Sequence, residues 1–308
     1  MTEFELIAKF FHTTPQLQST RLSVGDDCAL LKSAKTLALS TDTMVLHTHF
    51  FENADPFLLG QKALMINLSD LAAMGAKPLA FMLALTLPDA DPNWLEPFSQ
   101  GLKQVAQEYH LDLIGGNTTR GPLNINITII GELDEDQALK RDRAKTDDDI
   151  YVTGTLGGAA LGLQILQNKM SLPDELRQQA LAHFHTPTAR VAFAQDLLRL
   201  AHAAIDISDG LAQDLTHMLQ ASGVGADVMT TALPLFPEAD LLLALNGGED
   251  YELCFTAPQN AHTKIMTLAQ KHALQVTRIG TITDHKNLIF LDAQNQPMDI
   301  VIQGYQHF

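Results

Sequence analysis

The stretch from Phe57 to Leu87 is the most apolar part of the chain, and it constrains the fold more than any other feature. The charged residues and the proline that interrupt it are Lys62, Asp70, Lys77 and Pro78. Asp55–Pro56 is typical of an N-cap followed by a first-turn proline, and Gly75 predicts the helix end. A helix that is apolar on nearly every side must be buried, so the chain needs a layered fold around it.

Composition narrows the class of protein. The 308 residues are 46% apolar, enough for two packed domains and too many for a disordered chain. The net charge of −16 argues against a general nucleic-acid binder, but it leaves anionic substrates open because metal ions can invert the local sign. Two cysteines, Cys28 and Cys254, exclude a disulfide framework and fit a reducing cytoplasm. No apolar run predicts a signal peptide or a membrane span.

One segment divides the chain. Eleven of the sixteen residues from Asp134 to Asp149 are charged, which is typical of a solvated connector. We therefore predict an N-terminal domain over residues 1–135, a connector over 136–149 and a C-terminal domain over 150–308. Expected strands and helices alternate in both halves, for example the strand around 123–130 and the helix from Gly210 to Ser222. The fold class is α/β or α+β.

Several carboxylates lie where a surface charge is not the simplest interpretation. Asp70 lies inside the apolar helix, Asp42 at an expected strand end, and Asp206 inside the apolar strand AAIDIS, with Asp209 at that strand's end. A buried carboxylate without a partner is costly, so each should be paired or bound to metal. The alternatives are turn chemistry for Asp27 and Asp42, capping of a neighbouring element by Asp70, and an N-cap role for Asp209. Together they form a hard-oxygen set suited to Mg²⁺ rather than zinc.

The common nucleotide-binding motifs are absent. The sequence has no Gly-Lys pair and hence no Walker A loop, no protein-kinase HRD or DFG, and no GxGxxG. His47 and His49 form an HxH pair that is more typical of surface histidines than of a zinc site, although His49 alone could touch a substrate. A nucleotide site, if present, must therefore be of another kind.

Eight sequence strings in order resemble the thiamine-monophosphate kinase family, of the superfamily that includes aminoimidazole ribonucleotide synthetase. They cover essentially the whole chain: GDDCALL (25–31), STDTMV (40–45), NLSDLAAMGAKP (67–78), GGNTTRGP (115–122), YVTGTLGGAALGL (151–163), IDISDGLAQDL (205–215), NGGEDYELCFT (246–256) and GYQHF (304–308). The resemblance implies a two-domain aminoimidazole ribonucleotide synthetase-like fold whose N-terminal domains pair in a homodimer. It also implies ATP-dependent phosphorylation of thiamine monophosphate, the final step of thiamine diphosphate biosynthesis, by direct in-line transfer with several Mg²⁺ ions and usually K⁺.

The family's site residues carry over position by position. The resemblance assigns metal binding to Asp27, Ser40, Thr41, Asp42, Asp70, Asn117, Asp206 and Asp209, with Asp70 and Asp209 as the catalytic pair. It assigns ATP binding to Tyr109, Gly116, Asn117, Arg141 and Ser208. It assigns thiamine phosphate binding to His49, Glu249 and Tyr305. A carboxylate cage loaded with Mg²⁺ would cancel the charge of two phosphate substrates, which phosphoryl transfer requires.

One position departs from the family. Asn117 stands where the family usually has an aspartate, so this chain offers a neutral oxygen in place of a charged ligand. Two other functions therefore stay open: a cyclo-ligase-type ATP enzyme of the same superfamily, and a non-catalytic regulator that binds Mg²⁺ and nucleotide. Neither nucleic acid nor a membrane is an expected partner.

Overall fold

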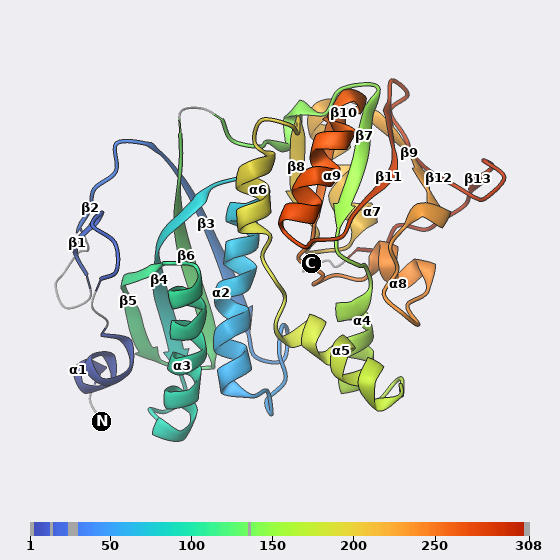
Figure 1. Ribbon diagram of the computed structural model, residues 1–308. Coiled ribbons are helices and arrows are strands. Elements are labelled where there is room, and N and C mark those ends of the chain that lie inside the picture. Colours follow the sequence, from blue (N-terminus) through green and yellow to red (C-terminus); the bar gives the residue numbers. More distant parts are fainter. Residues whose placement is uncertain (1–2, 13–14, 24–29, 135–136, 305–308) are drawn as a thin grey trace. The chain divides into compact units, whose positions relative to one another are not determined.

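A computed structural model describes residues 3–12, 15–23, 30–134 and 137–304. The chain divides into two compact units. Unit 1 comprises Met1–Leu71 and Ala76–Gln137, and unit 2 comprises Ala72–Gly75 and Ala138–Phe308. Each unit has its own main sheet (Figure 1).

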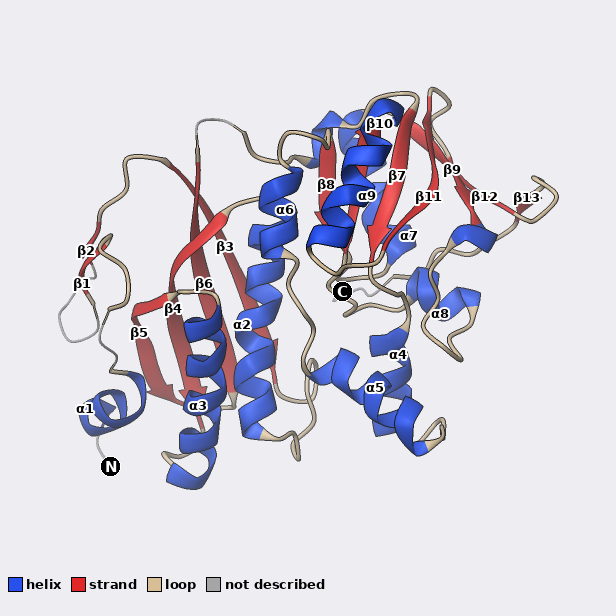
Figure 2. Ribbon diagram, viewed as in Figure 1, coloured by secondary structure: helices blue, strands red, loops and turns tan. Residues whose placement is uncertain are grey.

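Unit 1 is a four-stranded sheet with two long helices on one face. Its elements are α1 (Glu3–Leu6), η1 (Ile7–Phe11), β1 (Thr20–Leu22), β2 (Leu30–Leu31), β3 (Thr36–Val45), α2 (Pro56–Ala73), β4 (Lys77–Leu87), α3 (Pro92–Glu108), β5 (Asp112–Arg120) and β6 (Asn124–Leu133). The sheet order is β3-β6-β4-β5, in which only β4 and β5 run parallel. Helices α2 and α3 lie against the same face (Figure 2).

Helix α2 confirms the prediction made from the apolar stretch. The Asp55 carboxylate accepts hydrogen bonds from the backbone N–H groups of Phe57 (2.8 Å) and Leu58 (3.3 Å), as an N-cap does. The helix ends at Ala73, and Gly75 follows it in the left-handed conformation with φ +68°. The side chains of Leu64 and Leu68 are fully buried.

Two strands of unit 1 run further than the sequence predicts. The expectation that a strand ends before Asp42 is wrong, because β3 continues to Val45 in unbroken antiparallel register with β6. The glycine pair Gly115–Gly116 also predicts the end of a strand, but β5 continues through both residues to Arg120 alongside β4. In both cases ladder hydrogen bonds to a neighbouring strand override the local turn preference.

Unit 2 contains a seven-stranded sheet. Its elements are η2 (Arg141–Arg143), β7 (Asp148–Thr153), α4 (Gly158–Leu166), α5 (Asp174–His185), α6 (Val191–Leu197), β8 (Ala203–Asp206), α7 (Leu211–Ser222), β9 (Gly225–Met229), η3 (Thr230–Ala232), α8 (Leu241–Asn246), β10 (Leu253–Pro258), η4 (Gln259–Ala261), α9 (His262–Lys271), β11 (Val276–Thr283), β12 (Leu288–Leu291) and β13 (Pro297–Met298). The strand order is β13-β12-β9-β11-β7-β10-β8, in which only β9 and β12 pair in parallel.

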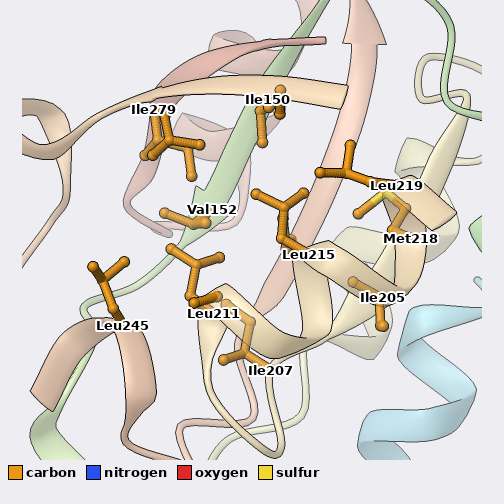
Figure 3. Packing of buried hydrophobic residues seen from close by; sticks show 14 of the residues in the cluster. Ile150, Val152, Ile205, Ile207, Leu211, Leu215, Met218, Leu219, Leu245 and Ile279 are labelled. Carbon is orange, nitrogen blue, oxygen red and sulfur yellow. The ribbon is translucent and has the colours of Figure 1, made fainter. Parts of the chain in front are cut away.

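The core of unit 2 lies between this sheet and α7. Figure 3 shows Leu211, Leu215 and Met218 of α7 pointing toward Ile150 and Val152 of β7, and all five are buried. Helices α6 and α9 contact each other, and Phe193 of α6 packs on Phe255 of β10 with ring centroids 6.0 Å apart. Ile207, the first residue after β8, is buried in the same core, so the start of the loop that follows this strand is held firmly.

Strand β7 begins inside the segment expected as a solvated connector. Asp148 and Asp149 are 3% and 4% exposed, and each has a cationic or ionisable partner. Asp148 lies 2.9 Å from the imidazole of His202, and Asp149 accepts from the Arg278 guanidinium at 2.7 Å. Charge-dense sequence cannot reveal such partners because they lie more than fifty residues away along the chain.

Mixed helix and sheet content in two units confirms the predicted fold class. Among the described residues, no helix combines the length and the apolarity that crossing a membrane requires.

Candidate functional site

Three of the predicted metal residues of unit 1 come from strand β3 and helix α2. Ser40 and Asp42 alternate with exposed positions along β3 and therefore share one face. The Ser40 hydroxyl donates a 2.5 Å hydrogen bond to Oδ2 of Asp70 in α2. Three oxygen-bearing side chains, two of them carboxylates, thus come from two regular elements. Asp70 is half-buried, and the Ser40 hydroxyl is one of its hydrogen-bond partners.

Thr41 lies apart from this set. Its side chain is on the opposite face of β3, where its hydroxyl donates to the carbonyl of Ile127 (3.0 Å) and accepts from the Thr128 hydroxyl (3.2 Å). The Thr41 side chain therefore belongs to a polar ladder on the open face of the sheet. Only its backbone lies between Ser40 and Asp42.

The predicted nucleotide residues of unit 1 lie on the other edge of the sheet. Gly116 (φ +149°) is in β5, where a Cβ atom would lie 1.8 Å from the Leu83 carbonyl oxygen, so only glycine fits. Asn117 is exposed in the middle of β5 and does not lie in a turn. Strands β3 and β5 are the two edges of the sheet, and three strand spacings of about 4.8 Å lie between them. Asp42 on β3 is therefore roughly 14 Å from Gly116 and Asn117 on β5. One ion cannot bridge both edges within one copy.

Two further predicted residues flank these strands. Tyr109 is half-buried at the C-terminus of α3, three residues before β5 begins. His49 lies in the turn after β3, where its Nδ1 atom accepts a 3.0 Å hydrogen bond from the backbone N–H of Val45. In the neutral imidazole the proton is therefore on Nε2, so that atom is a hydrogen-bond donor.

Two loops of unit 2 bring four predicted residues together. Asp206 ends β8, and Ser208 and Asp209 follow it before α7. The backbone N–H of Glu249 donates to the Ser208 carbonyl at 2.7 Å, and that of Tyr251 donates to the Ile207 carbonyl at 2.8 Å. The loop that contains a predicted nucleotide residue is thus joined to the loop that contains a predicted thiamine phosphate residue.

Asp214 holds the first of these loops, and the sequence analysis missed it. One of its carboxylate oxygens, Oδ2, accepts from three successive backbone N–H groups, those of Ser208 (3.0 Å), Asp209 (3.0 Å) and Gly210 (3.1 Å). Burial raises the pKa of Asp214 to about 7, partly opposed by these backbone donors. Asp209 is therefore not an N-cap: Gly210 occupies that position, and Asp209 is left to act elsewhere. The sequence signal for this role is the position of Asp214 in the first turn of α7, where a carboxylate interacts favourably with backbone N–H groups.

Two more buried acids hold the second loop. Asp250 accepts from the backbone N–H groups of Gly157 (2.8 Å) and Ala159 (3.4 Å) at the start of α4, and burial raises its pKa to about 8. Glu252 is 3% exposed and is clamped by both Nε and Nη2 of Arg190, with the hydroxyl of Thr153 as a third donor at 2.5 Å. Asp250 thus binds the start of α4, whereas Glu252 pairs with Arg190 and Thr153. Their spacing in the sequence does not distinguish these two roles.

Arg141 is not brought near Ser208. Its carbonyl accepts a 2.7 Å hydrogen bond from the hydroxyl of Ser222, which ends α7, whereas Ser208 precedes the start of that helix. Twelve helical residues span about 18 Å, so within unit 2 Arg141 is separated from Ser208 by the length of α7. Asp27 and Tyr305 lie outside the described residues. Within the described ranges, no group of three or more His, Cys, Asp or Glu side chains could by itself hold a metal ion.

Comparison with known proteins covers both units. Residues 25–133 match the family model of the AIR synthase related protein, N-terminal domain, and residues 145–292 match that of the C-terminal domain. A thiamine-monophosphate kinase of Salmonella typhimurium is 45% identical over 322 residues, which cover 99% of this chain and 98% of the relative.

Solved structures agree with the sequence relatives. The crystal structure of a thiamine-monophosphate kinase from Stenotrophomonas maltophilia superimposes with a TM-score of 0.84 at 40% identity, covering 89% of this chain and 92% of that chain. A second structure, described as "AaThiL complexed with AMPPCP and TMP", superimposes with a TM-score of 0.78 at 29% identity and covers 92% of both chains.

Proposed function

The chain belongs to the thiamine-monophosphate kinase family of the AIR synthase related proteins, and we propose that it transfers the γ-phosphoryl group of ATP directly, in line, to the phosphate of thiamine monophosphate. It is an ATP-dependent kinase that phosphorylates thiamine monophosphate. In the proposed step an oxygen of the acceptor phosphate bonds to the γ-phosphorus while the bond to the bridging oxygen of ADP breaks. The products are thiamine diphosphate and ADP, with no phosphoenzyme.

The joined loops of unit 2 support this proposal more than any other feature. Ser208, the predicted nucleotide residue, and Glu249, the predicted thiamine phosphate residue, are linked by a 2.7 Å backbone hydrogen bond. Direct transfer needs donor and acceptor phosphates in one place, because its catalysis consists mainly of positioning and electrostatics. A relative that carries an ATP analogue and TMP together in one structure is consistent with this arrangement.

The donor set fits magnesium. Carboxylate and hydroxyl oxygens of Ser40, Asp42 and Asp70 in unit 1, and of Asp206 and Asp209 in unit 2, are hard ligands of the kind that Mg²⁺ prefers. Bound Mg²⁺ would neutralise phosphate charge as the reaction proceeds. The chain's own part is to hold these carboxylates in place, as Ser40 does by donating a hydrogen bond to Asp70. K⁺ remains part of the proposal only through the family resemblance.

We propose that unit 1 pairs with a second copy of the chain. The sheet face opposite α2 and α3 presents apolar side chains at Leu39 (64% exposed) and Met82 (36% exposed), beside the hydroxyl ladder of Thr41. Exposed apolar patches on a sheet mark interaction surfaces. Closing two such sheets into one barrel would place the β5 edge of one copy beside the β3 edge of the other. Asn117 of the second copy would then lie closer to Ser40 and Asp42 than Asn117 of the same copy does.

Product analysis tests the function. With ATP, Mg²⁺ and thiamine monophosphate, we expect stoichiometric thiamine diphosphate and ADP; formylglycinamidine ribotide should not be cyclised. Initial-rate lines should intersect, because a direct transfer needs both substrates bound, whereas parallel double-reciprocal lines would contradict it. Absence of turnover would favour the alternative of a non-catalytic regulator that binds Mg²⁺ and nucleotide.

The proposed compartment is the cytoplasm, consistent with the free, buried thiol of Cys254.

A further inference from the structure

The amide oxygen of Asn67, inside helix α2, is buried without a hydrogen-bond partner. The residue is 1% exposed, and its Nδ2 group donates to the carbonyl of Ala63 at 2.9 Å, one turn back along the helix. Because a carbonyl only accepts, this bond fixes which end of the amide is nitrogen. The Oδ1 atom has no partner among the residues that the structure describes. A buried acceptor in this state costs free energy, so it requires an explanation.

The position of Asn67 on the helix directs its side chain toward the sheet between β3 and β6. Asp70 is bonded to Ser40 of β3, whereas Leu71 lies against Gly131 of β6, where an added Cβ atom would meet the leucine Cδ2 atom at 3.0 Å. At about 100° per residue, Leu71 projects about 100° from Asp70 around the helix axis, and Asn67 projects about 60° from it in the same sense. The Asn67 side chain therefore lies between the other two.

The level of Asn67 along the helix is that of Asp42 on the strand. The chain enters α2 from the end of β3 and leaves it beside the start of β3, because Lys77, just after the helix, and Leu37 pair with the same residue of β6. Helix and strand are therefore antiparallel. Asn67 lies about 4.5 Å back along the helix from the residue that bonds Ser40, and Asp42 lies about 6.6 Å beyond Ser40 along the strand.

The three predicted metal residues on this face offer the Asn67 oxygen no donor. The ionised carboxylates of Asp42 and Asp70 are acceptors only, and the single proton of the Ser40 hydroxyl is donated to Asp70. Acceptor oxygens that converge in this way are stabilised by a cation or by a water bound to a cation. Mg²⁺ fits, because it keeps several waters when carboxylates bind it, and each of these waters has protons to donate.

We infer that Asn67 is a further residue of the Mg²⁺ site in unit 1: its Oδ1 atom accepts a hydrogen bond from a water of the hydrated ion that Ser40, Asp42 and Asp70 hold. The inference rests on the magnesium site of the proposed function. Asn67 touches neither substrate, so it is a positioning residue that acts through the ion. Outer partners of this kind are worth about tenfold or more in metal affinity.

Isothermal titration calorimetry of the full-length chain with Mg²⁺ alone, at fixed ionic strength, tests the inference. Asn67→Leu removes the oxygen at similar volume, so the Kd for Mg²⁺ should rise about tenfold. Its melting temperature in EDTA should equal or exceed that of the wild type, because the variant no longer buries an acceptor without a partner. Asn67→Asp keeps an oxygen and adds charge, so it should bind Mg²⁺ at least as tightly as the wild type.

The matched control is Leu68→Val, at the next position of the helix, which removes only buried carbon. It should lower the melting temperature and leave the Kd for Mg²⁺ unchanged. Either a lower metal-free melting temperature or an unchanged Kd in Asn67→Leu would indicate a structural role, such as holding a buried water, and would overturn the inference. A wild type that binds no Mg²⁺ would overturn it too. If the Kd values behave as expected but no thiamine diphosphate forms, the inference holds and the proposed function fails.

Discussion

The two units hold their predicted functional groups by different means. In unit 1, Ser40, Asp42 and Asp70 project from a continuous strand and a continuous helix, and each element is stabilised by its own backbone ladder and by the apolar core. In unit 2, Ser208 and Glu249 are on loops, and buried acids outside the predicted set of site residues hold those loops. Regular structure positions a side chain without helpers, whereas a loop requires them.

This difference has a consequence for mutations. In unit 1 a functional carboxylate can be changed with little cost in stability, because the strand and helix do not depend on it. In unit 2 the residues behind the loops couple stability to activity, because Asp214, Asp250 and Glu252 are all less than 6% exposed. Removing the partner of a buried charge leaves an uncompensated group.

Asp70→Asn should show the largest effect on activity. Asparagine preserves the volume and an oxygen that can accept from Ser40, but it removes the charge, so kcat should fall about a thousandfold. The melting temperature, followed by circular dichroism, should stay within about 2 °C of the wild type. A parallel loss of stability would show that the carboxylate is a structural partner in unit 1 as well, and the comparison would break.

Arg190→Met should show the largest effect on stability. It leaves Glu252 buried without its guanidinium, so the free energy of unfolding measured with urea should drop by about 3 kcal/mol. Lys271→Met is the matched control, because its ion pair with Asp196 is exposed and its loss should cost less than about 1 kcal/mol. Equal losses in the two variants would mean that unit 2 does not depend on its buried ion pair.

Asp250 predicts how the stability of unit 2 depends on pH. Its pKa is raised to about 8 in the folded chain and returns to its ordinary value on unfolding, so the folded state binds more protons between about pH 4 and pH 8. Its contribution to stability is therefore lost as pH rises through that window. Asp250→Asn should flatten the profile, by about 4 kcal/mol between pH 5 and pH 8. The measurement is the free energy of unfolding in urea at several pH values for the wild type and for Asp250→Asn. The same dependence on pH in both proteins would contradict the prediction.

Asn117 in unit 1 should give the smallest effect. The residue is exposed in β5, so Asn117→Asp and Asn117→Ala should both fold normally. Added ligand charge should lower the Mg²⁺ concentration for half-maximal rate about threefold in Asn117→Asp, and loss of the oxygen should raise it in Asn117→Ala. The titrations are done at fixed ATP and ionic strength. Identical midpoints for the three proteins would remove Asn117 from the metal site.

The sequence by itself determined the features whose signals are local. These features all depend on residues a few positions apart: the cap at Asp55, the end of α2 just before Gly75, the period-two strand β6 and the start of α7 after Gly210. Eight motif strings in order determined the family, which the full-length relatives confirm. The sequence also predicted that Asp70, inside an apolar helix, needs a polar partner.

Tertiary structure decided everything that depends on contacts between distant segments. Ser40 and Asp70 are thirty residues apart, and Asn246 and Val301 are fifty-five. Pairing with β6 carried β3 past Asp42 and turned Thr41 to the open face, and the length of α7 separated Arg141 from Ser208. A carboxylate has the same local sequence signal whether it binds a metal, caps a helix or holds a loop. Its role is set by which donors the folded chain brings within about 3 Å, and those donors are fixed only when the whole core packs.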